Sequence, residues 1–382
     1  MSASRPAVPA SRSQLPALTG IRFPLALWVV IHHLSGRNRM FEPLVALSPA
    51  VRAIVDAAWV ALTVFFAISG FVLVRRYGTT RWSRSAIARY AVARFARVYP
   101  VYLISLLILV PIVVETFRHG GFDAGDRTWL LASHVLLLQG WHQPVVNWNT
   151  PAWSLSSEVF FYALFPAVAV LLRSRSWHAI AAAAVLAFAI PILLRLTIEP
   201  PIPKALLYFG DFLIGVAAGL AFERTGARTD RRTLGTALSS AAAAGGIGLM
   251  LFRDQLGSFL VFDAGIRLVS VLLVFGLASG GGIVWRTLAS APLLAGGRAS
   301  YAIYILHVPI LWFYERSAVR AALPPVEAGI VYVCLVLALA FVVMQGIEEP
   351  ANAIVRDRFA RRLARTRVVP PVVVAGGADQ GA

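Results

Sequence analysis

Arg22 and His33 are the residues of this sequence whose types and spacing point most directly to chemistry. Both lie in the apolar stretch 15–34, and eleven positions separate them. Eleven residues make about three turns of α-helix, so the two side chains share nearly one face and lie about 16 Å apart along its axis, whereas His32 points about 80° away. An arginine inside a membrane span costs about 2.5–3.5 kcal/mol on insertion scales, so it faces a protein interior or a wet cavity. We therefore expect a functional site within the membrane.

Glu158 supplies a carboxylate that could act together with His33. It lies in the apolar stretch 152–172, which runs inward from Pro151 in the orientation that the basic residues favour, so both groups lie in the outer part of the membrane. A carboxylate that fixes the imidazole tautomer and stabilises the imidazolium makes histidine a general base near neutral pH. The alternative is that His33 lies among the headgroups and Glu158 satisfies a neighbouring side chain. Matched depth, with Arg22 beneath the histidine, favours catalysis.

Three arginines, Arg89, Arg94 and Arg97, lead into the apolar stretch 98–116 from its inner side. Planar guanidinium groups form paired hydrogen bonds with phosphate oxygens, so this cluster could bind a phosphorylated ligand that arrives from the cytoplasm. The alternative is a basic flank that only sets the orientation of the helix. We expect Pro100 in the first turn of that helix, where proline is tolerated.

Small, aromatic and imidazole side chains mark two further helices. Ser69 precedes a glycine within the run 53–75, which predicts close helix packing, and no GxSxG motif that would make this serine a nucleophile surrounds it. Tyr301, Tyr304 and His307 follow one another at steps of three, so they share one helix face. His307 is expected near mid-membrane, where it either is satisfied by a neighbour or lines a substrate channel.

Other charged residues within the expected spans have a less definite meaning. Asp263 and Arg267 stand four residues apart, a spacing at which opposite charges on a helix neutralise each other. Asp211 has no evident partner in the sequence, and its role is left open. The one cysteine, Cys334, excludes a disulfide framework and any Cys/His metal cluster, so we expect no metal.

These residues need helices to position them, and the composition indicates a membrane bundle. Of the 382 residues, 58% are hydrophobic and only 14% are charged, as in polytopic membrane proteins. Apolar runs as long as a hydrocarbon core requires predict an all-α fold with about ten transmembrane helices. The run 129–139 is too short to span and is expected at the interface. The ten long runs are 17–36, 53–75, 98–116, 152–172, 178–197, 204–222, 233–252, 258–280, 299–317 and 326–346.

The basic residues orient this bundle. With both termini in the cytoplasm, 23 of the 35 lysines and arginines fall on inner segments and nine on outer ones. That distribution follows the positive-inside rule, and it explains the net charge of +17 by orientation and by contact with anionic lipid of the inner leaflet. Nucleic acid is not expected as a partner, since no readout fold accompanies the arginines.

Three segments are predicted along the chain. Residues 1–14 are polar and rich in serine, proline and alanine, and we expect them to be a disordered tail. Residues 15–350 form the transmembrane domain, whose first run is interpreted as a retained span rather than a cleaved signal. Residues 351–382 form a basic and then disordered cytoplasmic tail.

Five motifs in order resemble the integral-membrane acyltransferase family 3, and the likeness extends from about Leu15 to Pro350. No single motif is specific, but all five on ten helices are. They are Arg22 with His33 eleven positions on, Ser69-Gly-Phe, Arg94-Phe-Ala-Arg97-Val-Tyr-Pro, Trp153-Ser-Leu-Ser-Ser-Glu158, and Ser300-Tyr-Ala-Ile-Tyr-Ile-Leu-His307.

The resemblance implies a multi-pass enzyme of the cell membrane that moves an acyl group, usually acetyl, from cytoplasmic acyl-coenzyme A to a hydroxyl of a carbohydrate or glycosylated product. It implies that Arg22, His33 and Glu158 are catalytic. His32, beside the expected histidine, is a departure that could blur which ring acts. Acyl-CoA is then a co-substrate, bound by Arg89, Arg94 and Arg97, and no cofactor is held permanently. The residues expected to bind substrate are Ser69, Trp153, Ser154, Tyr301, Tyr304 and His307.

We hypothesise that His33, oriented by Glu158, deprotonates the acceptor hydroxyl for attack on the thioester, while Arg22 aligns the donor arm or stabilises charge. An acyl-histidine intermediate is the variant of this mechanism. The alternative function is a secondary transporter or flippase that exports a sugar-containing metabolite. A sensory or scaffolding membrane protein would leave the alignment of Arg22 with His33 unexplained. The acceptor, the acyl chain length and the oligomeric state are not specified by the sequence.

Overall fold

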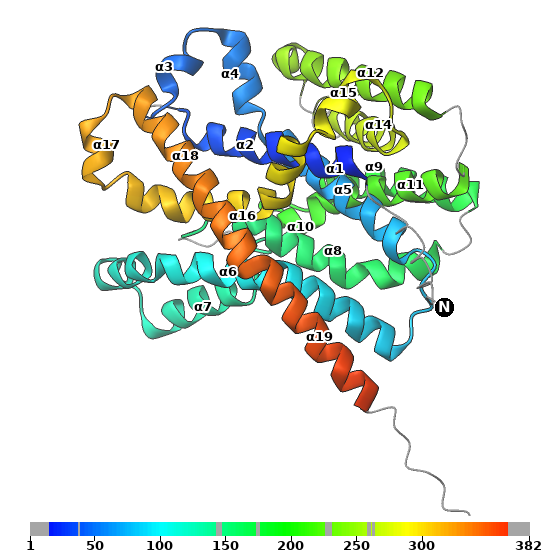
Figure 1. Cartoon of the computed structure of the whole chain (residues 1–382), viewed down its shortest axis with the longest axis horizontal. Coiled ribbons are helices and arrows are strands. Elements are labelled where there is room, and N and C mark those ends of the chain that lie inside the picture. Colours follow the sequence, from blue (N-terminus) through cyan, green and yellow to red (C-terminus); the bar gives the residue numbers. More distant parts are fainter. Residues whose placement is uncertain are drawn as a thin grey trace, which may run out of the picture.

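The computed structural model describes residues 15–36, 39–142, 147–172, 176–225, 231–257, 261 and 264–365 of the chain. Over these residues the protein is a bundle of helices and contains no strand, so the predicted all-α class is confirmed (Figure 1). The predicted tails 1–14 and 368–382 lie outside the described residues.

Seven helices in the described part of the chain are long and apolar enough to cross a membrane. A further span would be formed by α14 (Ile266–Ser279) with α15 (Gly282–Leu288), which meet at an angle of 79°. A membrane bundle is therefore confirmed, while the total of ten spans stays a prediction. The seven are α5 (Trp59–Tyr77), α6 (Arg84–His119), α8 (Ala152–Leu171), α9 (Trp177–Thr197), α10 (Lys204–Leu207) with α11 (Phe209–Thr225), α12 (Arg231–Leu251), and α18 (Pro325–Val343) with its continuation to Phe359.

Two of the expected spans take a different form. The run 17–36 is split at Ile21 into α1 (Pro16–Gly20) and α2 (Arg22–His33), so neither part alone is long enough to cross. The run 299–317 belongs to α16 (Ala291–Tyr314), which has 24 residues but is less apolar than the seven. Both carry polar residues of the candidate site.

The position of Pro100 was predicted wrongly. The helix that contains it, α6, does not begin near residue 98 but at Arg84, where Ser83 caps it by accepting a hydrogen bond from the backbone N–H of Ala86. Pro100 therefore lies in the middle of a 36-residue helix. The first half of α6 is polar enough to escape a search for apolar runs, and it carries the arginine cluster into the bundle.

The centre of the bundle is α11, most of whose residues are buried. It lies directly against α5, where a Cβ on Gly70 would come within 2.2 Å of the carbonyl oxygen of Phe212. The close packing predicted for the Ser69-Gly70 pair is thus confirmed, since only glycine allows the two backbones to approach so far. Gly215 makes the reciprocal approach to Ala67.

Helix α16 is the second organising element. It packs against α2, α18 and α6, and its Gly297 lies so close to α1 that a Cβ would be 2.0 Å from the carbonyl oxygen of Thr19. The expected interfacial run 129–139 overlaps α7 (Ala124–Val135), which has 12 residues and is too short to span. The remaining helices are α3 (Glu42–Val45), α4 (Pro49–Asp56), α13 (Arg253–Leu256), α17 (Ala318–Ala322), the π-helix η2 (Met344–Glu348) and α19 (Glu349–Arg365).

Candidate active site

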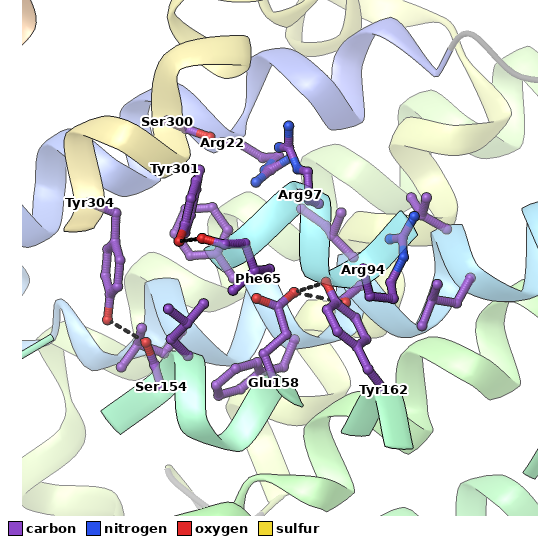
Figure 2. A pocket seen from close by; sticks show the side chains of 18 of the residues that line it. Arg22, Phe65, Arg94, Arg97, Ser154, Glu158, Tyr162, Ser300, Tyr301 and Tyr304 are labelled. Carbon is purple, nitrogen blue, oxygen red and sulfur yellow. Dashed lines mark hydrogen bonds between the residues drawn. The ribbon is translucent and has the colours of Figure 1, made fainter. Parts of the chain in front are cut away.

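A cavity of about 340 Å³ lies between α2, α5, α6, α8 and α16, and we call it the inner cavity. Eight of the residues predicted to form the site contribute to its wall, although they come from five separate helices (Figure 2). They are Arg22, Ser69, Arg94, Arg97, Ser154, Glu158, Tyr301 and Tyr304.

The inner cavity is strongly basic. Arg76, near the C-terminal end of α5, joins Arg22, Arg94 and Arg97 in its wall. The Arg94 guanidinium lies 5.5 Å from the ring of Tyr162 and 5.7 Å from that of Tyr77, and its buried Nε has no hydrogen-bond partner. Buried donors are normally paired, so this arginine is suited to an anionic ligand. Arg97 donates instead to Glu348 Oε1 at 2.6 Å.

Arg89 does not belong to this group. Its side chain is exposed and does not line the inner cavity, so the structure does not bring it together with Arg94 and Arg97. The reason is helix geometry: five residues of α6 rotate the side chain by about 140° from Arg94, whereas three residues separate Arg94 from Arg97 by only about 60°.

Glu158 lies in the inner cavity and not beside His33. Its Oε1 accepts hydrogen bonds from Ser69 Oγ at 3.1 Å and from the hydroxyl of Tyr162 (Figure 2). The expected pairing of Glu158 with His33 is therefore wrong. Equal depth along two helices did not make them neighbours, because α2 packs chiefly on α16 while α8 contacts α5.

The partner of His33 is His307. Its Nε2 lies 3.3 Å from His33 Nδ1, and that same Nδ1 lies 2.9 Å from the carbonyl oxygen of Val29. His307 Nδ1 in turn lies 2.6 Å from the carbonyl oxygen of Tyr304. A carbonyl only accepts, so each Nδ1 carries the proton, and His307 Nε2 accepts from His33. This assignment leaves the Nε2 of His33 unprotonated, as a base requires.

His32 is turned away from this pair. Its Nδ1 lies 3.1 Å from the carbonyl oxygen of Val55, and its ring meets that of His33 edge-on at 5.5 Å between centroids. The two adjacent histidines are therefore distinguished by their partners.

Tyr304 connects the histidine pair to the inner cavity. Its ring lines the cavity and lies 6.0 Å from that of His307, and its hydroxyl is 2.8 Å from Ser154 Oγ (Figure 2). Arg22 lies over Phe65, whose ring is 6.2 Å from Tyr304. His33, His307 and Trp153 are not themselves in the cavity wall. The arrangement is a basic cavity, with the His33–His307 pair on the far side of Tyr304 from the cavity wall.

Comparison with known families decides what kind of enzyme this site belongs to. A family model described as an acyltransferase domain, that of acyltransferase family 3, matches residues 15–345. The chain belongs to this acyltransferase family.

Two relatives give the same picture. Acyltransferase MdmB of Streptomyces mycarofaciens is 28% identical over 328 residues, which cover 79% of this chain and 80% of the relative. Protein 2 in picA locus of Rhizobium radiobacter is 28% identical over 163 residues, covering 39% of this chain and 78% of the relative. No solved structure matches. Family membership and the apolar helices together make this chain a membrane acyltransferase.

Sequence reasoning missed four residues in or beside the candidate site. Arg76 was counted only as an orienting charge, while Tyr162, Glu348 and Asn352 were not singled out. Tyr162 follows Glu158 by four residues, a spacing that faces the same side of a helix and could have revealed it. Glu348 ends the π-helix η2, and π-helical turns often mark functional sites, but nothing in the sequence signals one here.

The intramembrane charges also differ from expectation. Asp211 was left without a partner, but its Oδ1 accepts a hydrogen bond of 2.7 Å from Arg267 Nε, and both residues are buried. This pair links α11 to α14. Asp263, the expected partner of Arg267, lies outside the described residues.

Proposed function

We propose that this acyltransferase moves an acyl group from cytoplasmic acyl-coenzyme A to a hydroxyl of a carbohydrate or of a glycosylated small molecule. The observation that carries the proposal is the basic inner cavity, which Tyr304 joins to the His33–His307 pair. The coenzyme as donor and the sugar hydroxyl as acceptor follow from the family resemblance and agree with this chemistry. A multi-pass position in the cell membrane belongs to the same proposal.

The arginines support an anionic donor. Arg76, Arg94 and Arg97 lie toward the cytoplasmic end of the bundle by the charge distribution, and Glu158 is the only acidic residue in the described wall of the inner cavity. Phosphate oxygens would provide the partner that Arg94 Nε lacks. A volume of about 340 Å³ suits the acylated arm of the donor, with the nucleotide at the cytoplasmic mouth.

In this mechanism His33 is the general base. Its Nε2 takes the proton of the acceptor hydroxyl as that oxygen forms a bond to the acyl carbon, the carbon–sulfur bond breaks, and the proton passes to the departing thiolate. The Val29 carbonyl holds the imidazole in the required tautomer, and His307 accepts a second, longer hydrogen bond from the same Nδ1 and orients the ring. Arg22, about 16 Å below His33 along the helix axis, aligns the donor arm or balances its charge.

Glu158 takes a different part from the one that its depth predicted. It accepts hydrogen bonds from Ser69 and Tyr162 and stands opposite the arginines, so it holds the wall of the donor cavity. Its negative charge also limits the excess positive charge in a low-dielectric site.

The test is acyl transfer by the purified protein in lipid nanodiscs. Radiolabelled acetyl-CoA is the donor, and extracts of the cells that naturally contain this protein are the source of acceptors. We expect acceptor-dependent thiol release by the wild type and loss of at least about 100-fold in His33→Ala. His32→Ala is the matched control, because that ring is bonded to Val55 and should stay dispensable. Full turnover by His33→Ala would remove the base assignment, and movement of unmodified solute without thiol release would favour a transporter.

A further inference from the structure

A second cavity, of about 440 Å³, lies between the segment that connects α7 to α8 and the one that connects α9 to α10, and we call it the outer pocket. Both segments are on the outer side in the orientation given by the basic residues, so this cavity opens opposite the arginine cluster. Among its lining residues are Gln139, Trp141, His142, Asn147, Trp153 and Lys204.

The outer pocket combines flat aromatic surfaces with hydrogen-bonding amides and one cationic side chain, Lys204. Trp141 and Trp153 provide indole rings, and the side chains of Gln139 and Asn147 provide amides. An indole face carries negative electrostatic potential and attracts the polarised C–H groups on the face of a sugar ring, while amides bond its hydroxyls. The described wall holds no carboxylate, so the lining does not favour a cationic ligand.

Three polar atoms in this wall lack partners, Gln139 Oε1, His142 Nε2 and Asn147 Oδ1. Gln139 is 3% exposed, and its Nε2 donates to the hydroxyl of Tyr102 and to the carbonyl oxygen of Ala152, which fixes the amide and leaves Oε1 unbonded. His142 Nε2 is also buried and unbonded. Burial lowers the pKa of His142, so its ring is neutral at pH 7. Buried polar atoms are normally satisfied, and a ligand rich in hydroxyls would satisfy all three.

The pocket is built before any ligand arrives. The N–H of Gly140 donates to Ser156 Oγ at 3.1 Å, and the carbonyl oxygen of Gly140 accepts from the N–H of Ala205 at 3.4 Å. A Cβ at Gly140 would lie 2.9 Å from the carbonyl oxygen of Trp153, so glycine is needed for this approach. Both connecting segments are thereby tied to the start of α8, and a rigid site costs less ordering when it binds.

The outer pocket and the inner cavity share one wall. Trp153 lines the former and the next residue, Ser154, lines the latter. Ser154 is hydrogen-bonded to Tyr304, whose ring lies beside His307. A molecule held against Trp153 therefore lies next to Ser154, which is connected through Tyr304 and His307 to His33.

We propose that the outer pocket is the acceptor subsite and that it binds a pyranose ring of a glycosylated acceptor, with its face on an indole and its hydroxyls on Gln139 and His142. The role of the outer pocket as an acceptor subsite rests on the proposed function, but the binding of sugar to it can be measured without catalysis.

The first experiment measures access to the pocket. In a Cys334→Ser background, Lys204→Cys places a thiol at a position that lines the outer pocket, whose lysine ammonium now lies 4.4 Å from the centroid of the Trp153 ring. A membrane-impermeant maleimide should label it from the outside of intact spheroplasts. Methyl glycosides of glucose, galactose, mannose and rhamnose are the probes, and glycerol is the comparator without a ring. We expect at least one glycoside to slow labelling, with the rate halved at its Kd.

The controls separate pocket binding from general effects. Leu47→Cys, which replaces an outer side chain that is 79% exposed and lines neither cavity, should be labelled equally with and without sugar. Adding Trp141→Ala to the Lys204→Cys protein should raise about tenfold the glycoside concentration that halves the labelling rate. A tenfold change corresponds to the loss of one ring contact of about 1.4 kcal/mol. Trp312→Ala, an aromatic change in the outer half of α16, should leave protection unchanged.

The outcomes also distinguish this inference from the proposed function. Labelling that needs permeabilised membranes, or that no glycoside slows, would overturn the outer pocket as a sugar site even if acyl transfer is found. Protection by a glycoside that depends on Trp141, in a protein that transfers no acyl group, would support the sugar site and refute the proposed function.

Discussion

His307 and His33 are joined side chain to side chain, with Nε2 of the former 3.3 Å from Nδ1 of the latter, although 274 residues separate them in the sequence. The carbonyl groups of Val29 and Tyr304 fix the protons of both rings, so the direction of the hydrogen bond between them is determined. In the proposed mechanism His307 is therefore a positioning residue for His33, the role that catalytic sites more often give to a carboxylate.

Replacing His307 tests this arrangement. His307→Ala removes the side-chain acceptor for His33 Nδ1 and leaves only the Val29 carbonyl, so we expect kcat to fall by about 10- to 100-fold, as for other residues that orient a catalytic group. His307→Gln keeps a side-chain acceptor, and it should recover part of the loss. Steady-state kinetics of acyl transfer measures both variants. Equal rates for the alanine and glutamine variants would show that only packing at this position matters.

The donor site makes a prediction with an internal control. Arg94→Ala removes a buried guanidinium with an unpaired Nε from the inner cavity, and we expect the KM for acyl-CoA to rise about 10- to 100-fold. Arg89→Ala removes an exposed arginine from the same helix and should change that KM less than about twofold. Arg94→Lys should recover little, since an ammonium cannot form the paired contact.

A result opposite to this order would contradict the assignment of the donor site. If Arg89→Ala raised the KM for acyl-CoA as much as Arg94→Ala does, the arginines would act through the net charge of the inner surface and not through the cavity. Binding of the donor to nanodisc-embedded protein, measured by calorimetry, checks that the KM reports affinity.

The sequence was sufficient for the features that depend on one helix at a time. Apolar runs locate most spans, and the shared face of Arg22 with the outer residues of its helix follows from helical geometry. The neighbour of His33 could not be predicted, because depth says nothing about which helices lie side by side. Which helices are neighbours is set by packing. For example, Gly297 of α16 has no Cβ and so lets α1 approach closely.

The polar half of α6 shows a second limit. Its residues from Arg84 are helical because the helix continues through the arginine cluster, yet a search for apolar runs begins it near residue 98. The missing half determines which arginines face inward, so Arg89 could not be separated from Arg94 until the helix was known to be continuous. The same limit hid Glu348, whose place beside Arg97 needs two helices that meet.

The buried ion pair between Asp211 and Arg267 should be essential to the fold. Asp211 Oδ2 also lies 3.5 Å from Thr63 Oγ1, so the pair joins α11 and α14 to α5. Asp211→Ala leaves a buried guanidinium without its carboxylate and should lower the free energy of unfolding by about 3–5 kcal/mol. The double variant Asp211→Leu with Arg267→Met should recover most of that loss. Denaturant unfolding in mixed micelles measures both.

A surface pair supplies the comparison for this experiment. Arg253 and Asp56 are 4.0 Å apart, with 26% and 35% of their side chains exposed, so Asp56→Ala should cost no more than about 1 kcal/mol. If Asp211→Ala cost as little as Asp56→Ala, the buried pair would not hold the three helices together.

The last prediction follows from the close approach of α5 and α11. A Cβ on Gly215 would lie 2.0 Å from the carbonyl oxygen of Ala67, an atom of the backbone that cannot move aside alone. Gly215→Ala must therefore separate the two helices, and we expect it to lower the free energy of unfolding by about 1–3 kcal/mol. Because α5 carries Ser69 and Phe65 in the cavity wall, donor affinity should fall with it. Gly248→Ala, on α12, meets nothing within 4 Å and should instead raise stability by about 0.5–1 kcal/mol through helix propensity. Unfolding in mixed micelles compares the two alanines, and equal effects would mean that contact between α5 and α11 does not set the shape of the site.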